Sequence, residues 1–86
     1  MQVNNEEASS TSELEGQIAL ARLLVDRLER LSADSLWAHR ASGTRNALLR
    51  TLDHIDIDAG EDERRYLRLL IAWGFDLLEK AAAEIS

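Results

Sequence analysis

The residues that could do acid–base or metal chemistry in this chain of 86 residues are two histidines and a cluster of acids at positions 53–62. The cluster lacks a register with glycine at the sixth position and glutamate at the twelfth, as a calcium loop requires. The chain also has no cysteine, no Glu-x-x-His pair and no glycine-rich phosphate loop. We therefore predict a protein that is not an enzyme, with no catalytic residues, no metal site and no cofactor.

His39 is the residue that most suggests chemistry, because it is expected on the polar face of a helix. The segment 38–43 around it partly resembles the histidine phosphotransfer domains, which are helical bundles with an exposed phosphoaccepting histidine. In that family an alanine precedes the histidine, and lysine and glycine follow three and four residues later. The alanine, histidine and glycine match, whereas Ser42 replaces the lysine and Arg45 replaces a small residue. The resemblance implies His39 as the phosphoacceptor; the alternative is a solvated histidine.

Arg45 is the most unusual charged residue, since helical spacing places it within the apolar stripe of its own helix. A buried guanidinium without an acidic partner would cost several kcal/mol, on the order of the penalty for any unpaired buried charge. Asp26, Glu29 and Asp76 are the acids that could pair with it. We predict that Arg45 either extends to the edge of the stripe or forms a salt bridge, within the chain or between subunits.

The overall charge and the absence of long apolar runs limit the classes of partner. The net charge is −6, which argues against nucleic-acid binding, because that requires an excess of lysine and arginine. No apolar run reaches the length of about 18 residues that a membrane span needs. The first residues have no basic region followed by an apolar core, so we expect no secretory signal and a cytoplasmic protein.

Three amphipathic stretches must position these residues. They predict helices at about 12–31, 35–54 and 61–85, and a capping box at Ser12 and Glu15 marks the first start. Residues 1–11 are acidic and polar, and we expect a flexible N-terminal tail. Short connections favour antiparallel neighbours. The predicted fold is all-α: one domain, 12–86, forming an up-down-up antiparallel three-helix bundle, with dimerisation into a larger helical bundle left open.

The third helix carries more apolar surface than packing within one small chain requires. Its large apolar residues cover an arc of roughly 200°, where a surface helix needs about 100°. Aromatic residues dominate interface energetics, and Trp73 and Phe75 stand at opposite edges of this arc. The predicted interface residues on the first and third helices are Leu20, Leu23, Leu67, Ile71, Trp73, Phe75 and Leu78.

Gly74 lies in the middle of the third helix, one heptad before Ala81. A glycine in a helix interior costs about 1 kcal/mol relative to alanine. Close packing against another helix along Gly74 and Ala81 would offset that cost.

These observations favour a small acidic helical protein that acts through protein–protein association. Its partner is expected to be a second copy, as a homodimer, or another helical protein, with no nucleic acid and no membrane involved. Two alternatives remain: a phosphotransfer-like signalling protein using His39, and an acidic inhibitor or antitoxin-like protein that covers a basic effector surface.

Overall fold

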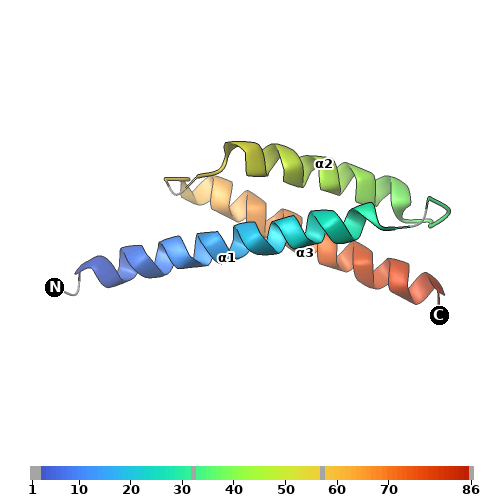
Figure 1. The fold of residues 1–86 in the computed structure, drawn as a ribbon, viewed down its shortest axis with the longest axis horizontal. Coiled ribbons are helices and arrows are strands. Elements are labelled where there is room, and N and C mark those ends of the chain that lie inside the picture. The colour runs from blue at the N-terminus through green and yellow to red at the C-terminus, as the bar shows by residue number, and fades with distance from the viewer. Residues whose placement is uncertain (1–2, 32, 57, 86) are drawn as a thin grey trace.

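The computed structural model describes residues 3–31, 33–56 and 58–85, with side chains between residues 12 and 84 of those ranges. It contains three α-helices: α1 (Val3–Glu29), α2 (Ala38–His54) and α3 (Glu61–Ile85). Each pair of helices is in contact. The molecule is elongated, 54 × 24 × 17 Å, and Figure 1 shows the two termini at opposite ends. The part of the chain that the structure describes is therefore all-α, as predicted.

Helix α1 begins at Val3, nine residues before the predicted start at Ser12. Most of the segment expected to be a flexible tail is therefore helical in the structure, while residues 1 and 2 lie outside the described residues. The chain has no proline, and its first glycine is Gly16, so nothing in residues 3–11 interrupts a helix. In Figure 1 the first turns of α1 project beyond the other two helices.

Helix α2 begins at Ala38, three residues later than predicted, because residues 35–37 form a turn. The Oγ of Ser35 accepts a hydrogen bond from the Trp37 amide at 3.1 Å. The carboxylate of Glu84, near the end of α3, accepts two more, from the Leu36 amide and the Ser35 hydroxyl, both at 2.7 Å. These bonds hold the turn after α1 beside the end of α3.

The core is formed by apolar side chains from all three helices, and it contains no buried polar or charged residue among those described. Each fully buried leucine contributes about 1.5–3 kcal/mol relative to an exposed one. The core residues are Leu14, Ala21, Leu24, Val25, Leu28, Ala41, Leu48, Leu67, Leu70, Ile71, Leu77 and Ala81.

Candidate functional site

The candidate site of this chain is a set of exposed apolar side chains on its surface. Several large apolar side chains stay at least one third exposed. They come from all three helices and from the turn between α1 and α2. An exposed apolar patch on a small protein commonly marks an interaction site. The exposed residues are Leu20, Leu23, Leu36, Leu49, Tyr66, Leu69, Trp73 and Phe75.

Helix α3 has an exposed apolar edge on each side of its buried face. Trp73 borders Arg40 and Thr44 of α2. Phe75 lies two residues further on, which at about 100° per residue is about 200° around the helix axis, or roughly 160° by the shorter way. Trp73 is 51% exposed and Phe75 is 41% exposed. The two aromatic residues therefore occupy opposite edges of α3, with Trp73 towards α2.

The edge at Phe75 meets α1, and we call the surface formed by Leu20, Leu23 and Phe75 the α1–α3 seam. Leu24 of α1 packs directly against Gly74, the residue before Phe75. Leu20 and Leu23 lie on the edge of α1 far from Glu29, the residue that reaches α2. Their side chains are 37% and 48% exposed. The seam therefore combines exposed apolar residues of two helices on the side away from α2.

The other residues predicted for the interface lie inward. Leu67 and Ile71 are buried in the core, and Leu78 is half-buried against it. These three side chains lie on the arc of α3 that packs against the other two helices. They therefore belong to the core beneath the seam and contribute little exposed surface. The sequence pattern could not separate them from Phe75, because all of them fall within one wide apolar arc.

Gly74 and Ala81 are both buried in the contact face of α3. A Cβ atom on residue 74 would lie 2.8 Å from the Cγ atom of Leu24, and closer still to its Cδ2 atom. Glycine at this position therefore allows the leucine side chain to pack onto the α3 backbone.

Arg45 is partly buried, with 30% of its side chain exposed, and it is paired within the chain. Its Nη1 atom lies 3.3 Å from Oε1 of Glu29, and its Nη2 atom donates to Oδ1 of Asn46 at 3.3 Å. Of the other two acids considered as partners, Asp26 pairs with Arg30 and Asp76 pairs with Lys80. The structure thus places the guanidinium at the border of α1 and α2, bonded to α1.

His39 is exposed in the first turn of α2. A side chain added at Gly43 would meet nothing within 4 Å, so this face of the helix is open. Ser42 and Arg45, the two positions that depart from the phosphotransfer pattern, line a hollow on the α1 side of α2 together with Ala38. The histidine is therefore accessible, while the matching residues around it remain few.

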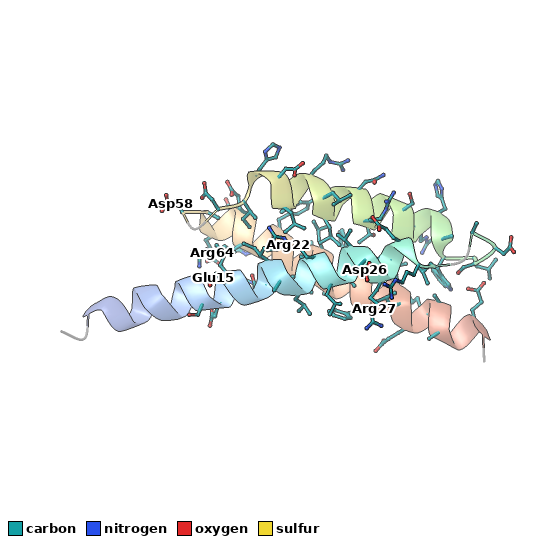
Figure 2. The ribbon with its side chains drawn as sticks, viewed as in Figure 1. Glu15, Arg22, Asp26, Arg27, Asp58 and Arg64 are labelled. Atoms are coloured by element: carbon teal, nitrogen blue, oxygen red, sulfur yellow. The ribbon has the colours of Figure 1, made fainter. Side chains whose placement is uncertain are left out.

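The acids near the second connection are used in local hydrogen bonds and ion pairs. Oδ1 of Asp56 accepts a hydrogen bond from the Asp58 amide at 2.9 Å. Arg68 donates to Glu61 at 3.0 Å, and this hydrogen bond, with the positive charge of Arg68, lowers the pKa of the Glu61 carboxyl. Within the described residues no group of three or more metal-binding side chains is assembled. Figure 2 shows Asp58 and Arg64 at this end of the molecule.

Tyr66 and Leu69 are surface residues that the predicted interface left out. They belong to the same apolar arc as Trp73, and their spacing of three and seven residues places all three on one edge of α3. The arc was visible in the sequence, but its division into core and two edges depends on where α1 and α2 pack.

None of the helices in the described part of the chain has the combined length and apolarity needed to cross a membrane. Among known proteins, no protein family, no curated protein and no solved structure matches this chain.

Proposed function

We propose that this chain is an up-down-up antiparallel three-helix bundle that works by binding protein, and that its α1–α3 seam pairs with the same seam of a second copy. The observation that carries the proposal is that Leu20, Leu23 and Phe75 stay 37–48% exposed on the two helices that meet where Leu24 packs against Gly74. Burying such side chains is favourable by about 25 cal/mol for each Å² of apolar surface removed from water.

A second copy suits this seam because the charges beside it are of opposite sign on the two helices. Arg27 follows Leu23 by one helical turn, and Glu79 follows Phe75 by one turn. Both are exposed, and within the described part of the chain neither takes part in an ion pair. In Figure 2 Arg27 lies on the side of α1 that borders α3. A two-fold axis parallel to α1 and α3 would bring Arg27 of each copy towards Glu79 of the other.

The proposal includes a non-enzymatic role for the chain. The protein would then act as a homodimer or as a subunit of a helical assembly. A cytoplasmic location remains part of this proposal.

The test compares two glutamate substitutions in the seam, Leu23→Glu and Phe75→Glu, with Leu49→Glu. Leu49 is a matched control, because it is 40% exposed but lies on α2. Sedimentation should show that the two seam variants dissociate while Leu49→Glu keeps the oligomer. Dissociation by Leu49→Glu alone would contradict the proposal.

Salt separates this proposal from the acidic-inhibitor alternative. Association through an apolar seam should persist when the ionic strength rises, whereas binding of a basic partner through surface charge should weaken steeply. Self-association that disappears in moderate salt would favour an electrostatic interface and contradict the apolar one.

A further inference from the structure

We propose that a second surface, between α2 and α3, binds an amphipathic helix of another protein whose polar edge is acidic. The surface is formed by Arg40, Tyr66, Leu69, Trp73 and Lys80, and we call it the α2–α3 seam. It lies on the edge of α3 opposite Phe75, so it is independent of the proposed dimer contact.

Three exposed apolar side chains form a continuous stripe along this seam. Tyr66, Leu69 and Trp73 are between 43% and 51% exposed. Positions i, i+3 and i+7 lie on one side of a helix, so the stripe follows α3 for about two turns, or about 10 Å. A stripe with this spacing matches the apolar face that an amphipathic helix presents to its partner.

The seam is hollowed at both ends of the stripe. One hollow of about 240 Å³ is lined in part by Arg40, Trp73 and Lys80. The other, of about 270 Å³, is lined in part by His54 and Tyr66. The hollows lie beside residues 63–66 and 73–80 of α3, so they would receive two large apolar side chains about three turns apart on a bound helix.

The hollow at Trp73 carries two cations that are held in place. The guanidinium carbon of Arg40 lies 5.3 Å from the ring centroid of Trp37, and Nζ of Lys80 lies 5.2 Å from the same centroid. Lys80 also pairs with Asp76 at 2.9 Å. Cations positioned in advance lose less conformational entropy when a partner binds.

These cations indicate the charge of the partner. The chain as a whole has a net charge of −6, yet this hollow is lined by two cations and one acid. An acidic residue at this end of the bound helix would therefore be attracted here, whereas Glu63, which lines the other hollow, would repel one at the other end. Tryptophan, tyrosine and arginine are also the residue types that contribute most binding energy in interfaces, and the seam exposes all three.

The test uses two synthetic peptides with the same leucine face, one flanked by glutamates and one by lysines. Binding to the full chain is followed by fluorescence anisotropy of labelled peptide. We expect the glutamate peptide to bind and Leu69→Glu or Trp73→Glu to abolish its binding. Leu49→Glu is the control, because Leu49 is exposed on α2 and belongs to neither seam, and this variant should leave the affinity unchanged. Circular dichroism checks that each variant keeps its helices.

Charge reversal provides the second part of the test. Arg40→Glu should lower the affinity for the glutamate peptide by roughly threefold to tenfold and raise the affinity for the lysine peptide. A charge at the edge of an interface acts mainly through attraction and repulsion. No binding of the glutamate peptide, or equal binding of both peptides, would overturn the proposal. So would a Trp73→Glu chain that loses its own oligomeric state, since the seam would then be covered by a second copy.

Discussion

Leu24 of α1 occupies the space in which a side chain of residue 74 in α3 would begin. The Cγ atom of the leucine lies 2.8 Å from the position of that absent Cβ atom, and Leu24 itself is only 1% exposed. The leucine is enclosed by the core, so it has little room to change its rotamer. This contact fixes the distance between α1 and α3, the two helices that carry the proposed dimer seam.

Gly74→Ala should destabilise the protein. Alanine improves helix propensity by about 1 kcal/mol, but overpacking a filled core costs about 1–3 kcal/mol. We expect the free energy of unfolding, measured by urea denaturation, to fall by up to about 2 kcal/mol, the difference between these two effects.

The matched control for this substitution is Gly43→Ala in α2. A Cβ atom at residue 43 would meet nothing within 4 Å, so only the propensity gain remains, and stability should rise by about 0.5–1 kcal/mol. Equal effects at residues 43 and 74 would contradict the packing described for Leu24.

The Arg45–Glu29 pair should contribute little to stability. Both side chains are partly exposed, and exposed ion pairs contribute about 0.2–1 kcal/mol. A double-mutant cycle with Arg45→Ala and Glu29→Ala should therefore give a coupling energy in that range. A coupling energy near zero, together with loss of the oligomer in Arg45→Ala, would instead place Arg45 in an intersubunit contact.

Glu84 should make stability depend on pH in the acid range. Hydrogen bonds from the Leu36 amide and then from the Ser35 hydroxyl lower the pKa of the Glu84 carboxyl below its ordinary value of 4.5. A lowered pKa in the folded state means that stability is present above pH 4.5 and is lost as the pH falls through the folded value. Thermal unfolding between neutral pH and pH 3 should show this loss, and Glu84→Gln should reduce it.

Glu61 should also make stability fall at acid pH, because Arg68 lowers the pKa of the Glu61 carboxyl as well. Glu84→Gln should therefore remove only part of the acid dependence, and the double variant with Glu61→Gln should remove more. If the pH dependence of thermal stability is the same for Glu84→Gln as for the unmodified chain, then the contact between Glu84 and the turn at residues 35–37 does not form in solution.

His39 should be dispensable for folding and should not carry phosphate. It is exposed, so His39→Gln should change the free energy of unfolding by less than about 0.5 kcal/mol. Incubation with phosphorylated receiver domains should leave no acid-labile label on the chain. A label that disappears in His39→Gln would instead support the phosphotransfer class implied by the sequence around this histidine.

The sequence predicts α3 well because its signals are local. Glu61, Asp62 and Glu63 favour the start of a helix, and the apolar arc continues to Ile85. The start of α1 was predicted wrongly for a related reason. The capping pattern at Ser12 is also a local signal, but no residue before it stops a helix, and α1 begins at Val3.

Features that depend on distant contacts could not be predicted in the same way. Residues 35–37 form a turn that is held partly by Glu84, which lies 49 residues from Ser35 in the chain. From the sequence, three acids are possible partners of Arg45. The packing of α1 against α2 places Glu29 beside it. Likewise, the apolar arc indicated surplus surface, but only the positions of α1 and α2 divide it into a core and two seams.

The most direct test of pairing between two α1–α3 seams is the solution mass of the unmodified chain, by light scattering after gel filtration at several concentrations. Pairing of the α1–α3 seams predicts a mass of twice the chain's 9.7 kDa that falls only on strong dilution. A mass of one chain at every concentration would contradict the proposed self-association.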